Sequence, residues 1–555
     1  MRTWNISVAI CLIALTLGAA ESPNRARLAE AITTEDTARQ SELLRALAEA
    51  HEPLVQQVLE AWRGGVVYIV EQDEKKIPVL LEVQTDSEGR AAATRISDGT
   101  LVKDETGANQ MFSSIDLVPA DASSKLRKAI KTTLDIFAVA NPNPKMRRDA
   151  VTKLGQEQKA EHLPVLEGRL QKESDPEVIK DLREAIALTE MASNDSGKRV
   201  RAIATLREMR SINSLAFLKT LSEEAAKSPE KYDAETIGDC RGAVYDIEQY
   251  IWWGNLFGTA FRGLSLSAVL LVAALGLAIT FGLMGVINMA HGELIMVGAY
   301  TTYMTQNLFR AWAAKNPAIV EFYFIPALLF SFITAAAAGL LLERTVIRFL
   351  YKRPLESLLA TWGVSLVLQQ VFRHTFGAAN VQVDSPGWLS GSFVISDVLL
   401  AYNRIFVIGF AIFIIGFTYW LLTRTSLGLQ IRAVMQNRSM ASALGVRTGR
   451  VNMLTFAFGS GLAGMAGACL SQIGNVGPSL GQNYIVDCFM VVVLGGVGNL
   501  VGTVAASLGV GVTDQILQPW LGAVLGKISV LAGIILFLQW RPAGLFVTRS
   551  RSLEG

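Results

Sequence analysis

Cysteine and histidine are scarce in this sequence, with four of each in 555 residues. No CxxC pair and no cysteine–histidine cluster occurs, so the sequence predicts no metal site and no bound cofactor. The cysteines are Cys11, Cys240, Cys469 and Cys488. Only Cys240 lies outside the apolar stretches, so the charged part of the chain has no disulfide framework of its own.

A nucleotide-binding loop is also missing. The string nearest to the phosphate-binding pattern is GAVLGKIS at 522–529, but its glycine spacing is wrong and it lies in an apolar stretch. No catalytic constellation stands out in the charged half, where His51 and His162 are isolated and indicate packing or helix-surface residues. The chain is therefore not expected to be an enzyme.

Charge is scarce in one half of the chain only. Residues 1–255 contain 33 Lys and Arg against 40 Asp and Glu, a net charge of −7. Residues 256–555 contain 18 against 9, a net charge of +9. This asymmetry predicts a soluble domain at 21–255, a membrane domain at 256–548 and a short cytoplasmic tail at 549–555. Nucleic acid is not expected as a partner.

The first 20 residues have the features of a secretory signal peptide. Arg2 precedes an apolar run of about ten residues, and Gly18 and Ala20 occupy the −3 and −1 positions of a cleavage site. An uncleaved anchor is the alternative. In both cases the domain that follows is expected to face outward.

The soluble half is expected to be mainly helical with a small β insertion. Residues 21–62 have helical periodicity, whereas 65–118 contain short β-rich runs such as GGVVYIV and PVLLEV. Residues 123–250 return to helices, and strings such as DPEVIKDLREAIAL resemble HEAT-type helical pairs, though irregularly spaced. Such pairs present a surface for partners, so this half indicates an interaction or scaffold domain.

The second half predicts an α-helical polytopic membrane protein of eight or nine spans. Two of its junctions are interrupted by glycine, GVINMAHGE at 285–293 and VVVLGGVGNLVGT at 491–503, which is typical of discontinuous helices near a substrate path. The apolar stretches are 262–283, 291–308, 323–343, 357–373, 405–423, 452–473, 483–497, 499–518 and 524–540.

Positive charge is concentrated on three segments, which together carry twelve Lys and Arg, while the segments between them carry four. Cytoplasmic loops are enriched in these residues, so the three segments are predicted to be cytoplasmic. With nine spans, the first span then begins outside, in agreement with the signal peptide. The twelve are Arg344, Arg348, Lys352, Arg353, five arginines within 424–450, Arg541, Arg549 and Arg551.

GVINMAHGE contains the main candidate site residues, Asn288, His291 and Glu293. A metal site is disfavoured, because His291 and Glu293 are the only ligand types there. Two interpretations stay open: the three side chains contact a small polar substrate, or they cap a broken helix and gate the path. The structural interpretation is favoured, since freed backbone groups in a membrane need partners. Asp487 and Asp514 are alternative polar contacts nearer the outer face.

Two further groups of residues indicate packing and coupling. Glycines at 461, 464 and 467, and a GxxxG pair formed by Gly498 and Gly502, predict close approach of membrane helices. The segment 424–450 predicts a helix that includes Arg432, Asn437 and Ala441 and is C-capped at Gly445. Its apolar face suits a cytosolic partner or, alternatively, lipid headgroups.

Several of these strings together resemble the permease subunits of branched-chain amino acid and urea ABC importers. They are GLAITFGLMGVINMAHGELIMVGAY, the ER…YKRP loop, RTSLGLQIRA…N…A…GV and VLGGVGNLVGT. The resemblance covers 258–547. ATWGVSLVLQQ and SPGWLSGS are most similar to the urea branch, some members of which also have a long secreted N-terminal extension.

The resemblance implies a subunit of a multi-protein importer in the bacterial inner membrane, with a periplasmic N-terminal domain. A second homologous permease would complete the pore, two cytosolic ATPases would dock on loops such as 424–450, and a periplasmic protein would deliver substrate. Urea is the substrate that the resemblance to the urea branch implies, and the spans themselves do not identify it. Asn288, His291 and Glu293 supply the donors and acceptors that such a small neutral molecule would need. The alternatives are branched-chain amino acids or short amides and, in another class, a membrane-anchored scaffold or sensor.

The predicted topology is testable by thiol labelling. A cysteine introduced at Asp181 should react with a membrane-impermeant thiol reagent in intact cells, because 21–255 is expected outside. A cysteine at Asn437 should react only after the membrane is permeabilised. The reverse labelling pattern would contradict the orientation.

Overall fold

The chain divides into two compact units, Met1–Ile251 and Trp252–Gly555, close to the change in charge at residue 255. The predicted signal peptide, His51, Lys352 and the tail at 549–555 lie outside the described residues. The computed structural model describes residues 23–34, 36–48, 53–72, 75–86, 90–104, 107–120, 123–227, 232–313, 317–351, 353–395, 397–542 and 544–546.

The first unit begins with three helices that pack under a small antiparallel sheet. Leu44, Leu59 and Trp62 are among its buried core residues. The strand order is β4-β3-β2-β1-β5, within the range for which the sequence predicts short strands. The elements are α2 (Pro23–Thr33), α3 (Thr37–Ala48), α4 (Pro53–Arg63), β1 (Val67–Gln72), β2 (Lys75–Thr85), β3 (Ala91–Arg95), β4 (Met111–Phe112) and β5 (Val118–Pro119).

The rest of this unit is helical, and four of its helices, α5, α6, α8 and α9, begin at capping side chains. Asp175 and Asp195 accept hydrogen bonds from the first free N–H groups of their helices, as aspartate favours at an N-cap. The resemblance to HEAT-type pairs stays a prediction. The elements are α5 (Ser124–Ala138), α6 (Pro144–Gln156), η1 (Ala160–His162), α7 (Leu163–Leu170), α8 (Pro176–Met191), α9 (Ser196–Glu208) and α10 (Leu215–Lys227).

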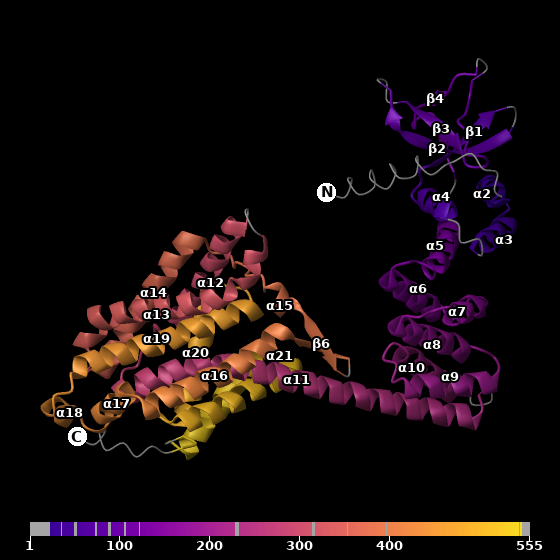
Figure 1. The fold of residues 1–555 in the computed structure, drawn as a ribbon. Helices are drawn as coiled ribbons and strands as arrows, with labels where there is room; N and C mark the ends of the chain where they lie inside the picture. Colours follow the sequence, from indigo (N-terminus) through magenta and orange to yellow (C-terminus); the bar gives the residue numbers. More distant parts are fainter. Residues whose placement is uncertain are drawn as a thin grey trace. The chain divides into compact units, whose positions relative to one another are not determined.

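The second unit is a bundle of long apolar helices (Figure 1). The helix α11 (Ala234–Met284) contains the boundary between the units. The main helices that follow are α12 (His291–Ala313), α13 (Phe324–Thr345), α14 (Pro354–Phe376), α16 (Tyr402–Arg424), α19 (Thr448–Ile473), α20 (Leu480–Gly495) and α21 (Leu500–Trp540). Shorter elements are η2 (Pro317–Phe322), η3 (Ile347–Phe349), α15 (Gly387–Ser390), β6 (Ser392–Ile395), β7 (Val398–Ala401), α17 (Ser426–Gln436) and α18 (Arg438–Ala443).

Each of the nine apolar stretches lies almost wholly within one of these helices, but the last two share α21. That element changes direction at Gly522, whose φ is +80°, close to Pro519.

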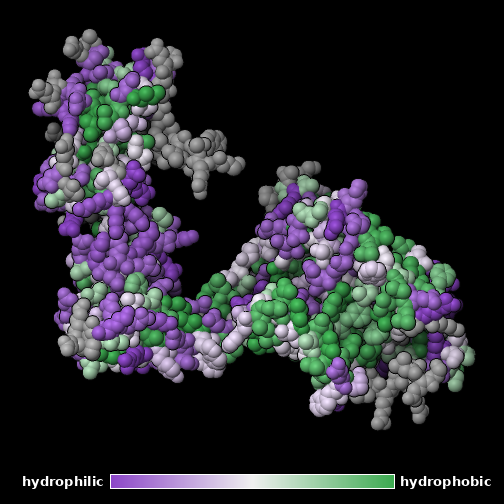
Figure 2. Space-filling model, turned by 180° about the vertical axis from the view of Figure 1, so that it is seen from behind, coloured by the Kyte–Doolittle hydropathy of each residue, from purple (hydrophilic) through white to green (hydrophobic). Residues whose placement is uncertain are grey.

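Within the described ranges, six helices are long and apolar enough to cross a membrane: α11, α13, α14, α16, α19 and α21. The helix α12 is outside this group, and α20 has only 16 residues. Hydrophobic residues gather on the surface of this unit, as Figure 2 shows.

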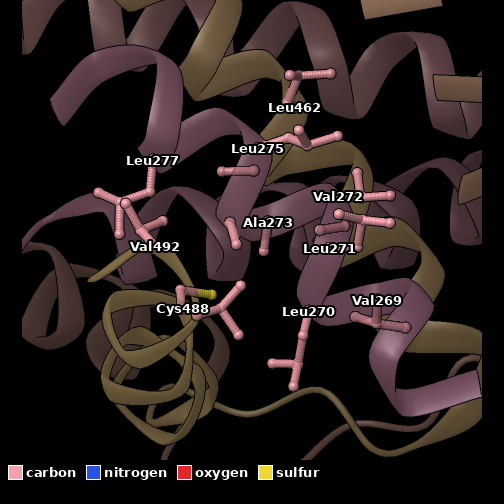
Figure 3. Close-up of a cluster of buried hydrophobic side chains, with 14 of the residues drawn as sticks. Val269, Leu270, Leu271, Val272, Ala273, Leu275, Leu277, Leu462, Cys488 and Val492 are labelled. Carbon is pink, nitrogen blue, oxygen red and sulfur yellow. The ribbon is translucent and has the colours of Figure 1, made fainter. Parts of the chain in front are cut away.

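Two of the six membrane-length helices, α11 and α19, lie mostly in the interior of the bundle. The apolar windows of α11 and α19 are 83% and 72% buried, whereas those of α13, α14, α16 and α21 are 17–28% buried. The outer helices therefore leave most of their apolar surface for lipid or for a partner subunit. Residues Val269–Leu277 of α11 share one cluster with Leu462 of α19 and with Cys488 and Val492 of α20 (Figure 3).

Glycines allow α19 to approach its neighbours closely. A Cβ atom on Gly467 would lie 1.9 Å from the carbonyl oxygen of Ile295 in α12, and one on Gly464 would lie 2.3 Å from that of Ser331 in α13. A Cβ on Gly461 would overlap the ring of Phe332. Any side chain at these positions would force the helices apart.

The predicted GxxxG pair at 498 and 502 is wrong as a helical motif. Gly498 has a φ of +80° and lies in the turn between α20 and α21, where an L side chain is disfavoured. It packs against Gly282 of α11, whereas Gly502 in α21 packs against Gly495 at the end of α20. The two glycines thus do not lie on one helix face. Gly498 allows the turn to approach α11, and Gly502 allows α21 to approach α20.

Candidate functional site

The chain is not helical between α11 and α12. The helix α11 ends at Met284, Gly285 has a φ of +63°, and α12 begins only at His291. Glycine adopts this backbone conformation at little cost, so Gly285 lets the chain leave α11 and turn into α12. Asn288, His291 and Glu293 therefore lie at a helix junction, and all three are at least 99% buried.

Asn288 caps the start of α12. Its Oδ1 accepts a hydrogen bond from the backbone N–H of Ala290 at 3.0 Å, and its carbonyl oxygen accepts one from the N–H of His291 at 3.4 Å. The N–H of Met289 donates to Oγ1 of Thr361 in α14 at 3.1 Å. The N–H groups of Met289, Ala290 and His291 thus have partners, which an apolar surrounding favours.

His291 ties α12 to α11. Its Nε2 lies 3.0 Å from the carbonyl oxygen of Ala273, an acceptor, so Nε2 carries the hydrogen of this bond. The ring lies against Gly276, where an added Cβ would lie 3.1 Å from Cε1 of the imidazole. The other ring nitrogen, Nδ1, is buried and has no hydrogen-bond partner among the described residues.

Glu293 ties α12 to α14. Its Oε1 accepts hydrogen bonds from Oγ of Ser365 at 2.9 Å and from Nε2 of Gln369 at 2.8 Å. Its Oε2 is buried and has no partner within the described ranges. The carboxyl group therefore joins two helices through one oxygen and keeps the other available.

The partners on α14 form a polar stripe that the sequence analysis did not single out. Ser357, Thr361, Ser365 and Gln369 follow one another at intervals of four residues, and all four are buried. Residues three and four apart share a face of a helix. The opposite face exposes Leu359, Trp362, Leu366 and other apolar side chains. The i, i+4 spacing of polar residues in an apolar span was the signal that could have found this stripe.

Five buried polar atoms at this junction and along α12 have no partner in the described part of the chain: Nδ2 of Asn288, Nδ1 of His291, Oε2 of Glu293, Oη of Tyr300 and Oε1 of Gln306. Buried polar groups are ordinarily hydrogen-bonded, so these atoms can serve a polar ligand or water. They offer a donor, acceptors and a hydroxyl. No group of three or more metal-ligating side chains occurs in the described residues.

Asp487 and Asp514 belong to a second polar cluster. Oδ2 of Asp487 in α20 lies 3.1 Å from Nζ of Lys527 in α21, and Oδ2 of Asp514 accepts a hydrogen bond from Nε2 of Gln518 at 2.6 Å. No hydrogen bond or ion pair in the described ranges joins this cluster to Asn288, His291 or Glu293. The sequence analysis missed Lys527, which lies 40 residues from its partner.

The segment 424–450 forms two short helices, α17 and α18, and the single helix predicted there is wrong. Asn437 has an extended backbone, with φ −161° and ψ 105°, and its Oδ1 accepts a hydrogen bond from the N–H of Met440 at 2.9 Å. It therefore ends one helix and caps the next, as asparagine favours. Gly445 has a φ of +88° and follows Leu444, the C-cap residue of α18, at the position where a left-handed glycine commonly ends a helix.

Burial in this segment differs from the predicted apolar face. Ala441 is buried at 4% exposure, whereas Met440 and Leu444 are exposed at 60% and 79%. Arg432 is also exposed. Because Ala441 is buried, an acidic substitution there would disturb local packing, and a loss of transport in that variant would not show that a partner docks at this position. Met440 and Leu444 form the apolar surface available to a partner.

A bundle of apolar helices that holds hydrogen-bonded ionisable groups at a helix break is typical of membrane transport proteins. A family profile described as "Branched-chain amino acid transport system / permease component" matches residues 259–539, half of the chain. The chain belongs to this family of permease components. Residues 1–258 lie outside the matched range.

Curated relatives match over the same length. The LivH permease of the high-affinity branched-chain amino acid transport system of Salmonella typhimurium is 29% identical over 293 residues, 51% of this chain and 93% of that protein. The corresponding permease BraD of Pseudomonas aeruginosa is 28% identical with the same coverage.

More distant relatives widen the range of named substrates. The autoinducer 2 import permease LsrC of Salmonella paratyphi B is 30% identical over 130 residues, 21% of this chain and 37% of that protein. No solved structure matches the chain.

Glu293 gives a test of the structural role of the junction. Glu293→Gln keeps an acceptor oxygen for Ser365 and Gln369, so folded protein and transport should stay within a few-fold of the unaltered chain. Glu293→Leu leaves both donors buried without an acceptor, at a cost of about 1–3 kcal/mol each, so the amount of folded protein should fall. Size-exclusion chromatography and uptake assays measure the two effects.

Met296→Leu, a volume-conserving change at a buried apolar position of α12, is the matched control and should be tolerated. If Glu293→Gln abolished uptake while the protein folded and assembled normally, the charge itself would take part in transport, contrary to this prediction.

Proposed function

We propose that this chain is the transmembrane permease subunit of an ATP-driven importer and forms half of its translocation path. Membership of the permease family and the apolar bundle support this proposal. The sequence contains no phosphate-binding loop, so two separate cytosolic ATPases provide the energy. A second homologous permease completes the path, and a periplasmic substrate-binding protein supplies it. The chain lies in the bacterial inner membrane, with 21–255 in the periplasm.

The junction between α11 and α12 carries the proposal. It is the place where a helix break, buried ionisable side chains and unpartnered polar atoms come together. Discontinuous helices of this kind supply polar groups for substrates at membrane depth without exposing backbone to lipid. The substrate therefore passes along α12 and the polar stripe of α14, with Glu293 between them.

Branched-chain amino acids are the first candidate substrates. The LivH and BraD relatives are named for them, and the family description names them too. An amino acid would donate hydrogen bonds from its ammonium group to the unpartnered acceptors of the junction and place its apolar side chain against the wall of the bundle.

Urea is the second candidate. Asn288 and Glu293 leave a donor and an acceptor unpartnered, a combination that matches a small neutral amide. The resemblance of ATWGVSLVLQQ and SPGWLSGS to the urea branch favours the same substrate. The relative named for autoinducer 2 import indicates that sequence similarity at this level leaves the substrate open.

Uptake of labelled substrates separates the candidates. Cells that carry the complete importer should accumulate labelled leucine or labelled urea, and cells that lack this chain should not. Gln369→Leu removes a donor to Glu293 and should lower uptake of the true substrate at least tenfold. Val367→Leu, on the exposed apolar face of the same helix, should leave it unchanged. Uptake of neither compound would contradict both assignments, and equal loss in the two variants would contradict a role for the stripe.

Coupling to the ATPases is testable at α18. Leu444→Asp places a charge on the exposed apolar surface, and burying it against a partner is strongly unfavourable, so uptake and substrate-stimulated ATP hydrolysis should fall together. The amount of chain in the membrane should not change. Ser442→Asp adds the same charge at an exposed polar position of α18 and is the matched control. Similar behaviour of the two variants would indicate that α18 faces solvent or lipid headgroups instead.

A further inference from the structure

The first unit contains a groove that the transport function does not use. Three helices, α3, α5 and α7, enclose a cavity of about 690 Å³, named here the α5 groove. The α5 residues that line it recur at intervals of three or four from Lys125 to Ile136, so they form one stripe along the helix. A helix of 15 residues is about 22 Å long, which gives the groove the length of a four-turn helix.

The α5 groove is basic although the half of the chain that contains it is acidic overall. Six cations line it, against one acid, Glu161. The six are Arg45, Lys125, Lys128, Lys159, Arg169 and Lys172. Residues 1–255 as a whole have a net charge of −7. The groove is therefore a local positive site that attracts an acidic partner.

Half of these cations already have acidic partners. Arg45 lies 2.9 Å from Glu161, Lys159 lies 2.7 Å from Glu157, and Arg169 lies 2.7 Å from the buried Glu173. Burial alone would raise the pKa of Glu173, but hydrogen bonds from Arg169, the Asp175 N–H, Arg147 and the Ser174 N–H lower it to about 2. These pairs are part of the wall rather than of a binding surface.

The remaining three lysines, Lys125, Lys128 and Lys172, make no ion pair within the described ranges and are exposed. They flank an apolar floor that includes Leu44, Ile136, Val139 and Val165. On α7, Gly168 faces open space, since an added Cβ would meet no atom within 4 Å. The groove thus combines an apolar floor, a charged rim and room beside α7.

We infer that the α5 groove binds an amphipathic helix with an acidic polar face, contributed by a partner protein. The apolar stripe of such a helix lies on the floor, and its carboxylates meet the three free lysines, the arrangement by which helices are recognised in grooves. A flat lipid surface cannot reach the floor of a concave groove. A small anion would use neither the apolar floor nor the length of the stripe.

A model peptide tests this inference on the full chain in nanodiscs. The probe is a fluorescein-labelled peptide of 15 residues, with leucine at helical spacing and glutamate on its other face. Fluorescence anisotropy, with empty nanodiscs subtracted, should give saturable binding that weakens as salt is raised. The double variant Lys125→Glu and Lys128→Glu should weaken binding at least tenfold.

The matched control makes the same change of charge on the same helix outside the groove. Arg127→Glu with Lys131→Glu alters exposed α5 residues that do not line the cavity, and it should leave binding within about twofold, since surface charges act weakly at a distance. Gly168→Leu fills the groove without changing charge and should also weaken binding at least tenfold.

Three results would overturn the inference. One is equal loss of binding in the groove and control charge variants, which would indicate general attraction of the acidic peptide. Another is equal binding of the same peptide with two central prolines, which cannot form the helix. The third is displacement of the peptide by inorganic phosphate or by anionic vesicles at concentrations that leave a neutral competitor without effect, which would indicate a small-anion or membrane site.

Discussion

A helix that begins inside an apolar bundle leaves backbone N–H groups that need partners, and water is not available to supply them. The arrangement around α12 follows from this constraint. Asn288 satisfies one N–H group at the start of the helix, and Thr361 of α14 satisfies another. His291 and Glu293 then fix the new helix to α11 and to α14. An unmet group would cost on the order of 1–3 kcal/mol, a large part of the net stability of a domain.

Close packing of the inner helices makes this junction possible. The α19 glycines let α12 and α13 approach until only a backbone carbonyl fits between them. In lipid the hydrophobic effect does not drive helices together, so contact between backbones and dispersion must do so. His291 and Glu293 are buried in these surroundings, so the partners of each of their polar atoms matter for folding.

Local sequence patterns predicted those features that depend on neighbouring residues. The apolar stretches lie in helices, the glycine-interrupted GVINMAHGE is a helix break, and the glycines at 461, 464 and 467 pack against backbone or rings. The break at Asn437 and the turn at Gly498 were missed, because both depend on backbone angles that single residues permit but do not dictate. The substrate stayed open for a related reason: the groups that meet it come from several helices.

Contacts between residues that are distant in the sequence could not be predicted from the sequence alone. Ser365 and Gln369 lie 72 and 76 residues from Glu293, and no pattern in either segment names the other. The α5 groove combines residues of three helices whose arrangement only the fold establishes. The periodicity of a sequence predicts which face of a helix is buried. It does not predict which polar residues on two such faces contact each other, because that depends on how the helices pack.

The polar stripe of α14 has a repeat of four residues, close to one helical turn. A displacement of α14 along its axis by one turn, about 5.4 Å, would replace Ser365 and Gln369 with Thr361 and Ser365 opposite the Glu293 carboxylate. Each register offers the carboxylate two hydrogen-bond donors. The exposed face of α14 is apolar over its middle turns, at Leu359, Trp362, Leu366 and Val367. The spacing of the stripe would therefore preserve two hydrogen-bond donors for the carboxylate if α14 moved by one helical turn.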